Sequence, residues 1–113
     1  MRISKTFVVK GDARNILERI EDYFTNVGFK KENATDDLLS LKRGENIWHS
    51  LIGYKIQDAK TLLTVHLQPN GGDVMISCEY NIDMSRRNPM SDDKQTILAE
   101  IDRLKNILSL ERP

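Results

Sequence analysis

Few residues in this chain belong to types that do chemistry, and adjacent pairs of them are the first to consider. Trp48 and His49 are neighbours, a combination that can form part of a ligand pocket or a stacking surface, although tryptophan serves equally well at the margin of a core. Arg86 and Arg87 precede an expected helix start at Ser91. Guanidinium groups and free backbone N–H groups at such a place can hold a phosphate or a carboxylate.

The arginine pair and the second histidine also have a purely structural interpretation. Asp92 and Asp93 already occupy the positive end of the helix that follows the arginine pair, which favours a solvated loop there. His66 falls on a regular strand beside Met75 and Ser77, without the cluster of ligands that zinc demands. We therefore interpret His66 as a solvated strand residue.

Two further residues with reactive side chains lie next to each other. Cys78 is the only cysteine, and its place on an apolar strand face favours a small buried residue over a nucleophile. Glu79 has no carboxylate partner of the kind that glycoside hydrolysis requires. The glycine-rich nucleotide motifs, His-Glu-x-x-His and paired Cys-x-x-Cys are also missing from the sequence. We predict no catalytic residue, no metal and no cofactor, and a role that is not enzymatic.

The clearest structural element is a hairpin within residues 60–83. Two strictly alternating segments meet at Asn70 and Gly71, a pair that suits the positive φ angles of a type I′ turn. With those two residues as the loop, Leu67 is expected opposite Val74 and apolar residues meet on one face. The same register predicts an outer face on which His66 lies opposite Met75, Thr64 opposite Ser77, and Leu62 opposite Glu79.

Two amphipathic helices are expected to cover the apolar face of this hairpin. The first has Asp12 as its N-cap and Gly28 as a left-handed residue after its last turn, with Phe29 packing back on Phe24. The second begins at Ser91. Apolar residues recur at spacings of three and four in both helices: Ala13, Ile16, Leu17, Ile20, Tyr23, Phe24 and Val27, and then Ile97, Leu98, Ile101, Leu104, Ile107 and Leu108.

The remaining strands complete one domain over residues 1–113. We expect strands at Ile3–Lys10 and Leu38–Arg43, and one at Ile47–Gln57 whose phase is doubtful. Whether Phe29–Glu32 forms an additional strand stays open. The result is an α+β fold of order β-α-β-β-β-β-α, with a mainly antiparallel sheet and both helices on one face.

This order of elements is similar to that of one half of the TATA-binding-protein-like fold, a resemblance carried by no sequence motif. Folds of that kind present an open sheet face to a partner, which implies a similar face here. The outward residues are polar but not basic, and Lys plus Arg equal Asp plus Glu at 17 each. A DNA-binding saddle and nonspecific nucleic-acid binding are therefore disfavoured.

The N-terminal stretch lacks the sustained apolar run of a signal peptide, and no segment reaches a membrane-spanning length. We expect a cytoplasmic protein without membrane insertion.

Two functions remain. The favoured one is a non-catalytic protein-interaction or assembly module, as a homodimer or with another protein, that uses the open sheet face. The residues that we assign to this face are Leu62, Thr64, His66, Met75, Ser77 and Glu79. The alternative is a small-molecule or anion-binding protein, with an enzyme as one form of it, built on Trp48, His49 and the loop with Arg86 and Arg87. A deep pocket with convergent polar groups would favour the alternative.

Overall fold

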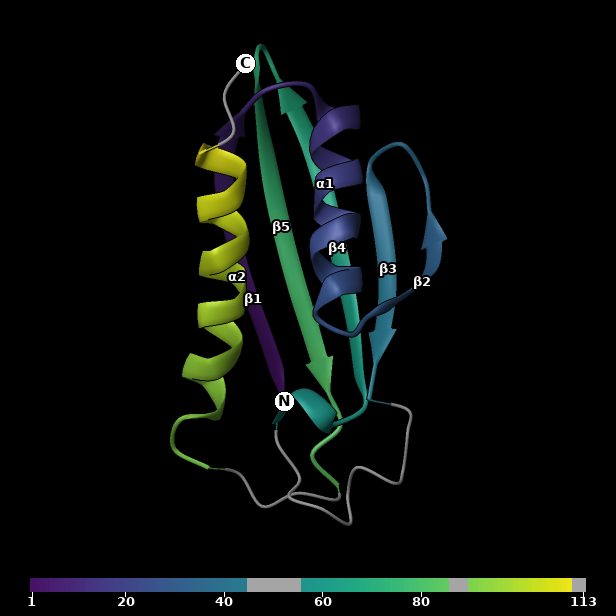
Figure 1. The fold of residues 1–113 in the computed structure, drawn as a ribbon, viewed down its shortest axis with the longest axis vertical. Coiled ribbons are helices and arrows are strands. Elements are labelled where there is room, and N and C mark those ends of the chain that lie inside the picture. The colour runs from purple at the N-terminus through teal and green to yellow at the C-terminus, as the bar shows by residue number, and fades with distance from the viewer. Residues whose placement is uncertain (45–55, 86–89, 111–113) are drawn as a thin grey trace.

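The fold is a single antiparallel sheet with two helices on one side (Figure 1). A computed structural model describes residues 1–44, 56–85 and 90–110 of the chain. The sheet has the strand order β1-β5-β4-β3-β2, and every neighbouring pair is antiparallel. The elements are β1 (Arg2–Lys10), α1 (Ala13–Asn26), β2 (Lys30–Ala34), β3 (Leu38–Arg43), β4 (Thr61–Asn70), β5 (Asp73–Ile82) and α2 (Asp93–Leu110).

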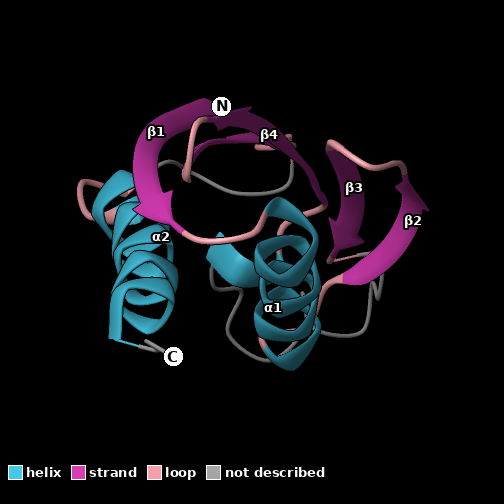
Figure 2. Ribbon diagram, turned by 90° about the horizontal axis from the view of Figure 1, so that it is seen from above, coloured by secondary structure: helices cyan, strands magenta, loops and turns pink. Residues whose placement is uncertain are grey.

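The two layers of the fold agree with the predicted α+β architecture. Figure 2 shows both helices beneath one face of the sheet, which curves around them. Helix α2 packs chiefly on β1, whereas α1 lies over β4 and β2. Neither of the described helices is long and apolar enough to cross a membrane. Within the described residues the predicted order β-α-β-β-β-β-α is confirmed, although its second strand is not the one that we expected.

The additional strand that the sequence left open is β2, which begins one residue after Phe29. Most of the strand expected at Ile47–Gln57 lies outside the described residues. Its last two residues do not continue a strand, because residues 56–58 form the 3₁₀ helix η2 (Ile56–Asp58). The N–H of Ala59 closes this turn on the carbonyl of Ile56 at 3.2 Å, and both side chains are buried.

Helix α1 begins and ends where its sequence predicts. The Asp12 carboxylate accepts a hydrogen bond from the Asn15 N–H at 3.1 Å, which satisfies one free donor of the first turn. At the other end Gly28 has φ of +103°, and the Phe29 N–H reaches the Phe24 carbonyl at 2.9 Å. The Phe24 and Phe29 rings are 5.5 Å apart. This is the Schellman ending expected from the sequence.

Helix α2 begins later than predicted. Ser91 and Asp92 lie in a turn, and the helix starts at Asp93. The Asp93 carboxylate turns back to accept the Met90 N–H at 2.9 Å, and the Asp92 carbonyl accepts the first helical bond from Thr96 at 3.0 Å. The helix therefore starts two residues after the predicted position, and the Asp93 side chain bonds back to the turn that precedes it.

The register of the β4–β5 hairpin differs by two residues from our prediction. Gly71 and Gly72 both have positive φ and form the two-residue turn, with Asn70 opposite Asp73. No described residue other than glycine has positive φ, so the turn centres on two glycines, which adopt such angles without steric cost. A shift of two preserves the faces but changes every partner. Leu67 now lies opposite Ile76, and Leu62 lies opposite Asn81 instead of Glu79.

The core between sheet and helices contains the residues that the alternation and the helical stripes predict. Ile20, Phe24, Ile101 and Leu104 are fully buried, as are the inward residues of the hairpin, Leu63, Val65, Leu67, Val74, Ile76 and Cys78. Leu17 is partly buried and packs against this cluster. Successive side chains of a strand point to opposite faces of the sheet, so the residues between these buried positions face away from the helices.

Cys78 should be unreactive while the protein is folded. Its side chain is fully buried, and burial raises the pKa of the thiol to about 12, so that almost none of it is thiolate at neutral pH. We expect a disulfide reagent at pH 8 to label the native protein slowly and the urea-unfolded protein at once. Equal rates in the two states would contradict the buried phase of β5.

Candidate functional site

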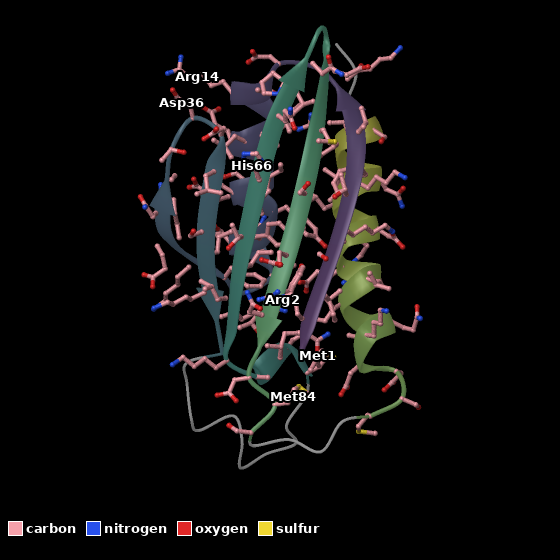
Figure 3. The ribbon with its side chains drawn as sticks, turned by 180° about the vertical axis from the view of Figure 1, so that it is seen from behind. Met1, Arg2, Arg14, Asp36, His66 and Met84 are labelled. Carbon is pink, nitrogen blue, oxygen red and sulfur yellow. The ribbon has the colours of Figure 1, made fainter. Side chains whose placement is uncertain are left out.

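The sheet face opposite the helices is the candidate site, and we call it the open face. Figure 3 views the molecule from this side, where no helix covers the strands. Its residues come from alternate positions of β1, β4 and β5: Ser4, Thr6, Val8, Leu62, Thr64, His66, Met75, Ser77 and Glu79. Six of these nine were assigned to the face from the sequence hairpin, and all six lie on it.

Three apolar side chains stand out on this polar surface. Leu62 is 41% exposed, Met75 is 36% exposed and Val8 is 56% exposed. Val8 is directly opposite Met75 in the β1–β5 pair, so the two form a small patch. Val8 was not among the residues that we assigned to this face from the sequence. The contact between Val8 and Met75 depends on the pairing of β1 with β5, and the sequence contains no local signal for that pairing.

The centre of the open face is lined by hydroxyl groups. The Thr6 and Ser77 hydroxyl oxygens are 3.1 Å apart, which is a hydrogen bond across the β1–β5 pair. Glu79 lies opposite Ser4 on one side and Thr64 on the other. Its carboxylate is 3.5 Å from Arg2 Nε in a largely exposed pair. Such groups can exchange water for a partner's hydrogen bonds at modest cost.

His66 is an exposed residue of this face. Its Nε2 lies 3.9 Å from an Asp37 carboxylate oxygen, and both side chains are more than half exposed. Within the described ranges, no three His, Cys, Asp or Glu side chains are grouped so that they could hold a metal ion. The four residues of the alternative site, Trp48, His49, Arg86 and Arg87, lie outside the described residues.

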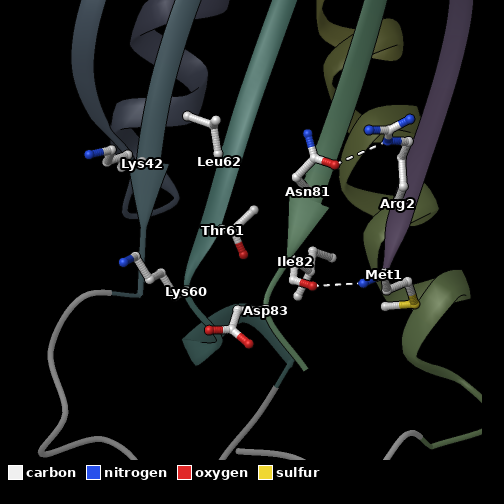
Figure 4. A pocket seen from close by; sticks show the side chains of 9 residues that line it. All are labelled: Met1, Arg2, Lys42, Lys60, Thr61, Leu62, Asn81, Ile82 and Asp83. Carbon is white, nitrogen blue, oxygen red and sulfur yellow. Dashed lines mark hydrogen bonds between the residues drawn. The ribbon is translucent and has the colours of Figure 1, made fainter. Parts of the chain in front are cut away.

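One end of the open face contains a hollow of about 530 Å³ (Figure 4). It is lined by Arg2, Lys42, Lys60, Leu62, Asn81 and Asp83, among others. The sheet register explains this grouping, because Lys42 is opposite Leu62, Leu62 opposite Asn81, and Asn81 opposite Arg2. Arg2 and Lys42 therefore lie outward at this end, and each is paired with an acidic side chain, Arg2 with Glu79 at 3.5 Å and Lys42 with Glu32.

A second polar cluster lies on the helical side and is buried. Arg43 Nη1 donates to a Glu100 carboxylate oxygen at 2.9 Å and to the Val27 carbonyl at 3.2 Å. The other Glu100 oxygen accepts the Tyr80 hydroxyl at 2.8 Å. The Arg43 guanidinium also stacks 4.1 Å from the centre of the Phe29 ring. This cluster connects the last residue of β3, the last turn of α1, the middle of α2 and Tyr80 near the end of β5.

The buried cluster is structural and has no access to the open face. Arg43 and Glu100 are 6% and 2% exposed. Burial, followed by the Glu100 charge, raises the pKa of Tyr80 far above its usual range, which keeps its hydroxyl a donor. The sequence offered one signal for this cluster, because Glu100 falls on the apolar stripe of α2, between Ile97 and Leu104.

The fold and site define a small α+β domain with an open antiparallel sheet, and comparison with known proteins supports this class. No family model matches the chain, and no curated protein matches its sequence. Similar solved structures exist at low sequence identity. The Aha1 dimer from Colwellia psychrerythraea is 12% identical with a TM-score of 0.65, and the alignment covers 100% of this chain and 99% of that chain.

Two further solved structures share the architecture. The vertebrate conserved region of human METTL16 is 13% identical with a TM-score of 0.52, over 96% of this chain and 100% of that one. Protein MLL2253 from Mesorhizobium loti is 12% identical with a TM-score of 0.53, over 92% and 96% of the two chains. Likeness at such identity establishes the fold and leaves function to be argued from the site.

Proposed function

We propose that this domain is a non-catalytic interaction module, and that its open face binds a second copy of itself. The observation that carries the proposal is the set of exposed apolar residues on a sheet face that no helix covers, with Val8 and Met75 opposite each other near one end and Leu62 near the other. Burial of such side chains between two copies removes apolar surface from water. The hydroxyl groups between them can pair across the interface, as they do in typical polar contacts of transient complexes.

The sheet edges are less suited to association than the open face. At one edge, β2 is fully exposed but short, contains Lys30 and Lys31, and has a register irregularity between Lys31 and Asn33. Lysines and bulges on an edge strand discourage the addition of another strand. At the other edge, Lys5 of β1 is paired with Asp102 of α2.

The solution structure of the Aha1 dimer, which shares this fold, supports a dimeric arrangement as one that such a domain can adopt. Because the sheet curves around its helices, two open faces meet mainly along their central strands. The contact is therefore small, and a small contact favours a weak, concentration-dependent dimer.

Replacing Leu62 with glutamate should weaken self-association about tenfold or more, because a charge would be buried where an apolar side chain packed. The register predicted from the sequence put Leu62 opposite Glu79, where a lysine would have been the suitable charge. In the observed register a lysine is unsuitable. Leu62 is opposite Lys42, so a glutamate is the charge that the fold tolerates. Sedimentation velocity over a range of concentrations measures the change.

The matched control is Ile107→Glu, because Ile107 is 40% exposed on α2 and Leu62 is 41% exposed on the open face. The control should associate as the unchanged protein does. If the unchanged protein stays monomeric at high concentration, the homodimer is wrong. If both variants associate normally, the open face is not the surface used.

A further inference from the structure

The two central strands of the open face have an exposed apolar side chain near each end. Leu62 of β4 lies opposite Asn81 of β5 near one end. Met75 of β5 lies opposite Val8 and Gln68 near the other end. At the usual rise per residue, Leu62 and Met75 are about 20 Å apart along the strands, so they cannot cover each other within one copy.

The stretch between these two ends is polar. Thr64 lies opposite Glu79, and His66 lies opposite Ser77, so that two polar rows fill the middle of the central strands. Each of these side chains can donate or accept hydrogen bonds. The order along the central strands is therefore apolar, polar, polar, apolar, which is the same from either end.

The orientation of a second copy decides what each apolar side chain meets. Most homodimers have two-fold symmetry and use the same surface of both copies. The sheet curves around its helices (Figure 2), so two open faces touch along β4 and β5, whose directions in the two copies are either the same or opposite. In the same direction, like ends meet. Because Leu62 and Met75 lie on different strands, an axis that stacks one of them on itself leaves the other without an apolar contact.

The opposite direction brings both apolar side chains into contact at once. Leu62 of one copy then lies over Met75 of the second copy, and the two-fold axis repeats this contact at the other end. Since the two residues are about 5 Å apart sideways and about 20 Å along the strands, this stacking makes the strands of the two copies cross at about 25–30°. Aligned sheets usually pack at such an angle.

The same orientation also matches the polar rows. With the axis midway between Leu62 and Met75, Glu79 of one copy lies near Ser77 of the second copy, and Thr64 lies near His66. A carboxylate then meets a hydroxyl donor, and an imidazole meets a hydroxyl group. Polar groups that leave water at the interface therefore find hydrogen-bond partners there.

We propose that two copies join through their open faces with the central strands in opposite directions, so that Leu62 of each copy packs on Met75 of the other. This inference rests on the proposed homodimer and specifies which residues of the second copy the face recognises. Both apolar side chains leave water in this orientation, which is the term that favours it over the alternative.

Cysteine cross-linking measures the orientation. Leu62→Cys and Met75→Cys each place one thiol on the open face, whereas Cys78 is buried, and the unchanged protein gives its background. One variant is labelled with a heavy nitrogen isotope, the two are mixed, and a short bis-maleimide is added. Mass spectrometry then separates mixed dimers from self-linked ones. The mixed dimer should exceed each self-linked dimer several-fold, beyond the excess that random pairing gives.

Charge replacement tests the same contact without a cross-linker. Leu62→Glu and Met75→Lys should each weaken self-association, and an equal mixture of the two should recover it, because the opposite charges meet across the interface. The matched control mixes Leu62→Glu with Met75→Glu, in which like charges meet, and should stay dissociated. Sedimentation velocity measures both mixtures.

Two kinds of result would overturn the proposal, and they are distinguishable. Self-linked dimers in excess, or equal association of the two charge mixtures, would exclude the contact between Leu62 and Met75 while the sedimentation result for Leu62→Glu upholds the homodimer. If no variant cross-links and the unchanged protein sediments as a monomer, the homodimer itself is wrong and the orientation fails with it.

Discussion

Glu100→Ala should lower the free energy of unfolding by about 3–5 kcal/mol, because it leaves a buried guanidinium without its counter-charge. Arg43 Nη1 would lose its contact to the carboxylate at 2.9 Å, and the Tyr80 hydroxyl would lose its acceptor. Two other nitrogens of Arg43, Nε and Nη2, are already buried without hydrogen-bond partners. The site therefore has no spare acceptor to compensate. Urea unfolding followed by circular dichroism measures the loss.

Two controls distinguish this effect from a general loss of a glutamate. Glu18→Ala removes an exposed carboxylate from α1 and should change stability by no more than about 0.5 kcal/mol. The double variant Arg43→Met with Glu100→Leu removes both charges and should lose less stability than the sum of the two single changes, although the Tyr80 hydroxyl still lacks its acceptor. Additive losses in the double variant would show that the two residues do not act as a pair.

Ile20→Ala and Leu104→Ala should each cost about 2–5 kcal/mol, since both side chains are fully buried between the helices and the sheet. One side chain lies on α1 and the other on α2, so together they test whether both helices share one core. Denaturant unfolding gives each value. Should an alanine variant fail to fold, Ile20→Val should still fold and cost roughly 0.5–1.5 kcal/mol.

Ile107→Ala is the control on α2, one turn beyond Leu104 and 40% exposed. It should be nearly neutral. A neutral result for Ile20→Ala or Leu104→Ala would contradict the arrangement of two helices on one face. A large loss for Ile107→Ala would show that the phase of α2 is different from the one described.

The sequence by itself determined the elements whose signals are local. Asp12 and Gly28 mark both ends of α1 because capping involves only residues within one turn. Alternation along β4 and β5 separates the buried Val65 and Cys78 from the exposed Leu62 and Met75, since side chains of a strand point in turn to opposite faces. The open face could therefore be assigned before the register was known.

The hairpin register is an intermediate case, in which the sequence allowed two solutions. Asn70-Gly71 and Gly71-Gly72 both suit a turn with positive φ, and both keep the apolar residues on one face. A register that moves by two residues leaves the pattern of faces unchanged, so alternation could not distinguish them. The fold adopts the turn with two glycines and thereby places Leu62 beside Lys42 and Asn81.

Only the tertiary structure decided the contacts between distant segments. The pairing of β1 with β5 places Val8 opposite Met75 and brings Arg2 into the same row of the sheet as Lys42. The local sequence of a strand does not indicate which other strand it will pair with. Arg43 and Glu100 are separated by 57 residues and meet only because α2 packs over the sheet. Such contacts depend on how whole layers pack, and the free energy of that packing is a property of the complete core rather than of any segment.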